Sequence, residues 1–179
     1  MEKREENKKP SDEIILNINT YDEIFSDFDP RIFSQRSLSD DFLLEVKKAT
    51  LEKEKPLKLR FLIPSSERNL RVEVTIKKRL NEHFKHHSKD LNQERKNTIK
   101  QGLIFTFFGI LLMIITTFIL VEATIKSIVI IFLSVLFEPG GWFFFWEGLN
   151  LIIFESKKKT PDLEFYEKMS KASIIFDAY

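Results

Sequence analysis

The chain has 179 residues, a size typical of one ordinary domain, with 28 basic and 27 acidic side chains. Its net charge of +1 argues against a dedicated nucleic-acid-binding protein, which would carry a basic excess, so we expect no nucleic acid among its partners. The absence of Cys excludes disulfides, thiolate nucleophiles and Cys-ligated metals.

The N-terminal part divides into a charged tail and a mixed region. Residues 1–12 are rich in charge and lack an apolar core, which indicates a disordered tail rather than an export signal. Residues 13–100 are predicted to form a cytoplasmic α+β domain with a stalk helix. Segments 13–19 and 58–63 have the pattern of strands, and Ser39 is placed to cap an amphipathic helix between them.

A longer helix is predicted to begin at a cap on Ser66 and to cover residues 66–100, which is 35 residues or about 52 Å. It either continues into the apolar stretch that follows or breaks near residues 86–89, and the pattern favours neither alternative.

Two apolar stretches within residues 101–155 predict a two-span transmembrane hairpin. The first, 103–121, has 19 residues without a charge, enough to cross a bilayer core as a helix. The second, 127–154, is long enough only if its Glu, Pro and Gly positions are helical, which membrane helices tolerate. The alternative is a buried hairpin in a soluble core, which the uniformly apolar first stretch disfavours.

The distribution of basic residues predicts the orientation of this hairpin. Lys and Arg cluster at 85–100 and at 157–159, whereas the connection 122–126 holds one Lys and one Glu. The positive-inside rule then places both termini in the cytoplasm and the protein in the inner (plasma) membrane as a multi-pass protein. Trp142 and Trp146, one helical turn apart, are expected to anchor the second span at the interface.

Residues 156–179 are predicted to complete the cytoplasmic domain. Thr160 and Pro161 are expected to start a short helix, and residues 173–178 form the third strand candidate. Because three short strands cannot bury much separately, we expect the C-terminal strand to pair with the first two. The predicted fold is thus a membrane α-helical hairpin plus a small cytoplasmic α+β domain with about three strands.

Polar residues within the second span suggest a possible site. Glu138 and Glu147 lie nine positions apart, on opposite faces of a straight helix, whereas Glu147 and Asn150 share a face. One interpretation is an ion or proton pathway in an oligomer, with hydroxyls of the first span as further ligands, namely those of Thr106, Thr116 and Thr117. The simpler interpretation puts Glu138 at a kink and lets Glu147 reach the inner interface.

Glycines repeat at seven-residue spacing in both spans and predict close helix packing, within the hairpin or against a second copy. They are Gly102, Gly109, Gly141 and Gly148.

Three histidines, His83, His86 and His87, cluster on the predicted stalk helix. Two of them could share a metal with Glu82 or Asp90, but no fourth ligand is evident, so a solvated helix face is the preferred interpretation.

Segment 21–38 combines acidic and aromatic residues. Its acids do not match an EF-hand loop. We expect Phe28 and Phe33 to anchor the segment and Asp29 to pair with Arg31 or Arg36, which makes it a candidate interaction surface. No nucleophile arrangement or nucleotide-binding loop is evident anywhere in the sequence, so we expect no catalysis, cofactor or metal.

Several motifs resemble a family of uncharacterised prokaryotic membrane proteins with an N-terminal α/β region, two membrane spans and a closing helix. They are Phe28-Asp29-Pro30, Phe33, Arg36-Ser37-Leu38, the run GWFFFWEGLN at 141–150 and Tyr166-Glu167-Lys168. The chain departs from the family after the second Trp, where Gly148 and Asn150 replace the usual Pro and acid, and near Ser156, where lysines replace an aromatic pair. The resemblance implies architecture only, because the family has no assigned activity.

The leading hypothesis is therefore a non-enzymatic membrane protein in the lipid bilayer that forms homo-oligomers or serves as a subunit of a membrane complex. The alternative is an oligomeric ion channel or pore lined by Glu138, Glu147 or Asn150. A membrane hydrolase is a third hypothesis, for which the sequence offers no convincing nucleophile.

Overall fold

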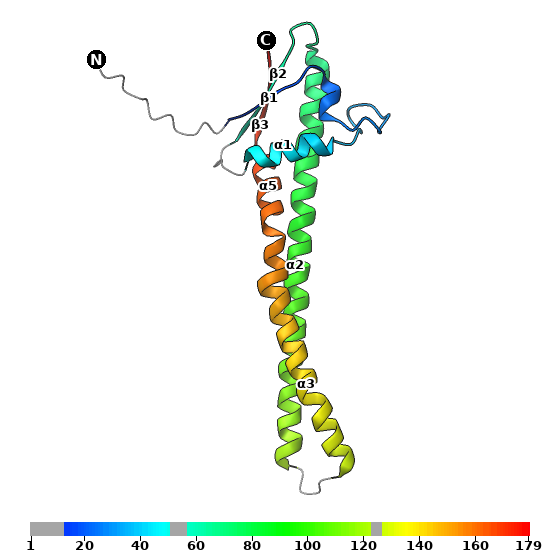
Figure 1. The fold of residues 1–179 in the computed structure, drawn as a ribbon, viewed down its shortest axis with the longest axis vertical. Helices are drawn as coiled ribbons and strands as arrows, with labels where there is room; N and C mark the ends of the chain where they lie inside the picture. Colours follow the sequence, from blue (N-terminus) through cyan, green and yellow to red (C-terminus); the bar gives the residue numbers. More distant parts are fainter. Residues whose placement is uncertain (1–12, 51–56, 123–126) are drawn as a thin grey trace, which may run out of the picture. The chain divides into compact units, whose positions relative to one another are not determined.

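The computed structural model describes residues 13–50, 57–122 and 127–179 (Figure 1). The predicted tail 1–12 and most of the loop between the two apolar stretches lie outside these residues. The chain divides into two compact units. The first combines the chain up to Lys89 with Leu163–Tyr179, and the second comprises Asp90–Asp162.

The first unit is built on a three-stranded sheet, which confirms the predicted strands. β1 (Glu13–Asn17), β2 (Lys58–Ile63) and β3 (Ser173–Ala178) are all parallel, in the order β1-β2-β3 (Figure 1). The C-terminal strand therefore joins the sheet as predicted, but it pairs with β2 and not with β1. The sequence did not predict the parallel direction. That direction makes both connections β–α–β crossovers, so this unit is α/β and the expected α+β class is wrong.

Two crossovers connect these strands. The first contains the 3₁₀ turn η1 (Tyr21–Ile24) and helix α1 (Asp40–Thr50). Ser39 caps α1 as predicted, because its Oγ accepts a hydrogen bond from the Phe42 N–H at 3.5 Å. The second crossover leaves β2 through the long helix α2 and returns to β3 through α5 (Thr160–Ser170), so in sequence the whole apolar hairpin is inserted between β2 and β3.

The helices cover one face of the sheet. A β–α–β crossover is almost always right-handed, so a strand order of 1-2-3 sends both crossovers over the same face. Burial agrees with this, because Leu59, Phe61 and Ile63 of β2 are fully buried, while Arg60 between them is only partly buried. The core side chains from the helices are Phe42, Val46, Ile76, Leu80, Phe84, Phe165 and Met169.

Helix α2 (Leu70–Glu122) is continuous over 53 residues, which answers the open question of a break near residues 86–89. Its predicted start was wrong. Residues after Pro64 form a turn in which the Glu67 N–H donates to the Pro64 carbonyl at 3.0 Å. Asn69 rather than Ser66 caps the helix, because its Oδ1 accepts from the Arg71 N–H at 3.1 Å.

The second apolar stretch forms helix α3 (Ile128–Asn150), which begins at a Ser127 cap and continues through Pro139. A π-helical turn η2 (Leu151–Glu155) and the short α4 (Ser156–Lys158) prolong it. Thr160 was expected to cap the next helix, but it is the first residue of α5 itself, so the helix begins one residue earlier than predicted.

Two helical segments, Leu70–Val121 and Ile128–Lys158, are long and apolar enough to cross a membrane. Only 11 % of the most apolar window of each is buried in the protein. A hairpin in the core of a soluble protein would be mostly buried, so the exposed apolar surface argues against that alternative.

Candidate functional site

Helices α2 and α3 pack closely at the glycines in the second unit. A Cβ atom on Gly148 would lie 2.5 Å from the backbone N of Thr106 and 2.6 Å from the carbonyl O of Gly102. Both distances are shorter than any real Cβ contact, and both involve backbone atoms that cannot rotate away. The absence of a side chain at Gly148 therefore allows the two helices to approach each other this closely.

The same close approach recurs two turns away. A Cβ on Gly109 would lie 2.5 Å from the backbone N of Phe145 and 2.7 Å from the carbonyl O of Gly141. Gly140 differs from its neighbour, since a Cβ there would have no atom within 4 Å. The four glycines singled out in the sequence thus lie within the hairpin contact, and Gly140 lies away from it.

The three threonines that the sequence suggests as pathway ligands form hydrogen bonds within their own helix. The hydroxyls of Thr106, Thr116 and Thr117 each donate to the carbonyl four residues earlier on α2, at 2.9 Å. Such back-bonding satisfies the hydrogen of each hydroxyl within its own helix and leaves the oxygen lone pairs open to a ligand.

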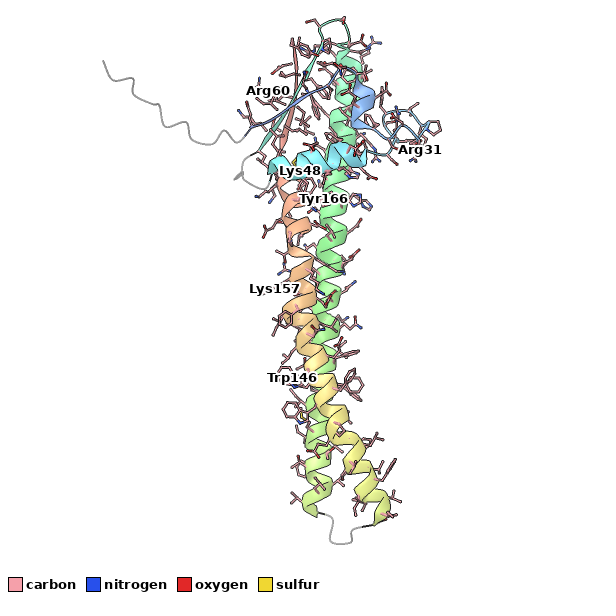
Figure 2. The ribbon with its side chains drawn as sticks, viewed as in Figure 1. Arg31, Lys48, Arg60, Trp146, Lys157 and Tyr166 are labelled. Carbon is pink, nitrogen blue, oxygen red and sulfur yellow. The ribbon has the colours of Figure 1, made fainter. Side chains whose placement is uncertain are left out.

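The outer side of α3 carries a groove of about 470 Å³. It is lined by Pro139, Trp142, Phe143, Trp146, Glu147 and Asn150. The two indole rings are nearly parallel, with centroids 6.3 Å apart and planes at 19° (Trp146 is labelled in Figure 2). Asn150 Nδ2 donates to Glu147 Oε2 at 3.5 Å, so the predicted shared face of this pair is observed.

Glu138 does not belong to this groove. Its side chain is exposed, and α3 stays helical through Pro139, so the two acids of the second span keep different surroundings. The groove therefore combines one carboxylate and one amide with three aromatic rings.

Comparisons with models of protein families, with curated proteins and with solved structures found no significant match to the chain. The resemblance to a two-span family stays a prediction, and the chemistry of the site has to be derived from the chain's own residues.

The histidines of α2 pack with an aromatic ring from α5. The rings of His83 and His87 are 4.3 Å apart, and His87 stacks on Tyr166 at 5.1 Å (Tyr166 is labelled in Figure 2). No group of three or more potential ligands suited to a metal occurs among the described residues. Burial, with added repulsion from the charges of His87, Arg79 and His86, lowers the pKa of His83 to about 4.

Acid should therefore destabilise the first unit through His83. Its pKa is about 4 in the folded state and near the ordinary 6.5 in the unfolded state, so the unfolded state binds more protons between these values. As the pH falls from 6.5 to 4, we expect a loss of about 1–2 kcal/mol of stability once solvent screening is allowed for. Urea unfolding across this range checks the loss. The variant His83→Gln should flatten the profile. His86→Gln should change it far less, because repulsion from His86 is the smallest cause of the lowered pKa of His83, and equal profiles for both variants would contradict this assignment.

A buried carboxylate in the first unit was missed by the sequence analysis. Glu73 is 3 % exposed and receives Arg68 Nε at 2.9 Å and the Tyr21 hydroxyl at 3.2 Å. The Asn69 N–H in turn donates to the Tyr21 oxygen at 2.9 Å, and burial is the main cause of the raised pKa of Tyr21. Nothing in the spacing indicates this cluster, because Tyr21 lies 52 residues away from Glu73. It fixes the first crossover to the start of α2.

Segment 21–38 is held by ion pairs, partly as predicted. Asp29 pairs with Arg31, whose Nη2 lies 2.7 Å from Oδ2, and accepts the Ser37 N–H at 2.7 Å. The Arg31 guanidinium is the main cause that holds the pKa of Asp29 well below its usual range. Phe33 packs against the core, but Phe28 is 98 % exposed, so its predicted role as an anchor is wrong. The turn closed by the Asp29 N–H and the Ser26 carbonyl directs Phe28 to solvent.

Proposed function

We propose that the chain is an integral protein of the inner membrane whose helical hairpin anchors the small α/β unit on the cytoplasmic side. In this proposal it acts without catalysis, as a membrane-anchored module that self-associates or joins a larger complex. The observation that carries the proposal is the long apolar surface of two tightly packed helices that the chain itself leaves exposed. A soluble monomer rarely exposes so large a contiguous apolar surface.

The sheet supports the second half of this proposal. Parallel sheets are almost always covered on both faces, whereas the helices in the described part of the chain cover only one face. Ile15 on the other face is 55 % exposed. The same face carries Arg60, which bridges the sheet by pairing with Glu13 at 2.9 Å and with Asp177. A protein partner or a second copy would complete the covering of this face.

The channel hypothesis has less support. Glu147 and Asn150 line the groove, whereas Glu138 is exposed outside it, so the three residues of this hypothesis do not share the same surroundings. Two helices cannot enclose a pore alone, so a strictly monomeric mass in detergent would remove this hypothesis. The same measurement would also remove homo-oligomerisation and leave a hetero-complex as the assembly.

Membrane insertion predicts a position-dependent effect of a single carboxylate. The variant Val135→Asp should reduce the fraction that resists alkaline carbonate extraction, because an Asp near the centre of a span costs about 2.5–3.5 kcal/mol on insertion scales. Val74→Asp is the matched control, since Val74 is 67 % exposed and Val135 is 66 % exposed, both on helices. Wild-type protein that carbonate releases completely would contradict insertion, and a periplasmic reporter active after Tyr179 would contradict the orientation.

A further inference from the structure

We infer that the groove on α3 binds an organic cation, meaning an ammonium group carried by a lipid head group or by a soluble amphiphilic amine. The inference goes beyond anchoring and rests on the proposed membrane placement of α3. It follows from the aromatic walls of the groove, from its single carboxylate and from the depth at which that carboxylate lies.

The walls of the groove are aromatic and open to a ligand. Trp142, Phe143 and Trp146 are 48 %, 63 % and 60 % exposed, so their rings are not consumed by packing within the chain. Ring faces of Trp attract ammonium groups, and the attraction strengthens where the cation is shielded from water. Two parallel indoles one turn apart give a continuous surface of this kind.

Glu147 supplies the charge. Within the described part of the chain its only hydrogen bond is the long one from Asn150, and no Lys or Arg nitrogen lies within 4.0 Å of its carboxylate. A carboxylate at the edge of an apolar helix surface is stabilised by a positive partner, because such a surface screens charges less than bulk water does. Since the protein provides only an amide, the remaining oxygen positions are free to face a cationic ligand.

The depth of Glu147 matches the level of lipid head groups. Its neighbour Gly148 packs against Thr106, so the carboxylate lies at the level of the first turn of the apolar stretch that starts at Leu103. Trp side chains are enriched at this level of a bilayer. An ammonium group of a lipid lies at the same level, whereas a soluble amine would reach the groove from the water side.

The residues of the groove favour an organic cation over a metal ion. Hard metal cations require several oxygen ligands, and the groove offers one carboxylate and one amide. The other walls are three aromatic rings and a Pro, which suit the methyl or methylene groups of an organic ammonium.

Fluorescence can test the assignment directly, because Trp142 and Trp146 are the two Trp residues of the chain and both line the groove. The full-length protein in a neutral maltoside detergent is titrated with benzyltrimethylammonium in one arm and with phosphatidylcholine in the other. Neopentylbenzene, the uncharged isostere, and phosphatidylglycerol are the matched ligands. We expect a saturable change in Trp emission with at least one of the two ligands that carry a quaternary ammonium group, and a non-saturable or absent change with their matched ligands.

Two carboxylate variants complete the experiment. Glu147→Gln should weaken the response at least tenfold, while Glu138→Gln, outside the groove, should leave it unchanged. A response to phosphatidylcholine alone identifies a lipid head group, and a response to benzyltrimethylammonium alone identifies a soluble amine. The inference would be overturned if neither benzyltrimethylammonium nor phosphatidylcholine gave a saturable response, or if the matched ligands gave equal responses. It would also be overturned if Glu147→Gln left the response unaltered. A change in Trp emission that depends on protein concentration and not on ligand concentration would also overturn the inference. It would indicate that a second copy of the chain occupies the groove.

The failure of this inference is distinguishable from failure of membrane anchoring. Detergent presents the groove whether or not the chain inserts into a bilayer, and carbonate extraction reports insertion separately. Trp142→Phe, which keeps an aromatic wall, serves as the second variant, and monodisperse elution verifies that each variant is folded.

Discussion

Replacing Phe176 by Ala should destabilise the first unit by about 3–5 kcal/mol, the usual range for a buried Phe. Phe176 is 4 % exposed, stacks on Phe61 with ring centroids 4.9 Å apart, and meets the edge of Tyr21 at 5.8 Å. Its removal would leave a cavity beside the central strand, and typical domains have only about 5–15 kcal/mol of stability in total. The variant should therefore unfold the unit at moderate urea concentrations.

The measurement is protease resistance of residues 13–89 in the full-length protein as urea is increased. Cleavage in this region should begin at a lower urea concentration in Phe176→Ala, although the substitution lies after the hairpin in sequence. Tyr179→Ala is the control, since Tyr179 is 57 % exposed and its backbone groups bond Ile63 and Ser65 regardless of side chain. Unchanged resistance of 13–89 in Phe176→Ala would contradict a sheet shared by the two ends of the chain.

Local patterns were sufficient to predict most of the elements. Short apolar runs located β1 and β2, and the uncharged run 103–121 located the apolar part of α2. The seven-residue spacing of the glycines located the helix contact, because that spacing returns a residue to the same face of a helix after two turns. In each case the physical cause of the structure lies within a few residues of sequence.

Features that depend on distant residues were not predictable. The parallel pairing of β2 with β3 joins positions more than 100 residues apart, and no turn between them fixes the register. Glu73 appears as one of several acids until Tyr21 and Arg68 are brought to it. The sequence predicts Phe28 as an anchor, whereas the local turn between Ser26 and Asp29 leaves it exposed.

The groove on α3 likewise has one part that local sequence predicts and another that depends on distant residues. The sequence indicated that Glu147 and Asn150 share a face and that the two Trp residues lie one turn apart. It did not indicate that these two pairs border the same groove, because the face of α3 left open depends on which face packs against α2. The glycines at 141 and 148 decide this, since they bring one side of α3 against α2 and leave the aromatic side outward.

Replacing Gly148 by Ala should separate α2 from α3, although Ala is the better helix former. The new methyl would lie 2.5 Å from the Thr106 nitrogen and 2.6 Å from the Gly102 oxygen, so the helices must move apart. Overpacking of this kind typically costs about 1–3 kcal/mol. We expect a lower unfolding temperature of the hairpin in detergent, with a larger decrease for Gly148→Leu because the larger side chain requires a wider separation.

Gly140→Ala is the matched control, and its effect should have the opposite sign. A methyl at Gly140 meets no atom within 4 Å, so only the helix propensity changes, which favours Ala by about 1 kcal/mol in a helix interior. The same substitution would then destabilise the hairpin at position 148 and leave it equal or more stable at position 140. Equal shifts of the unfolding temperature in both variants would show that backbone propensity, rather than close contact between α2 and α3, explains the glycines of the hairpin.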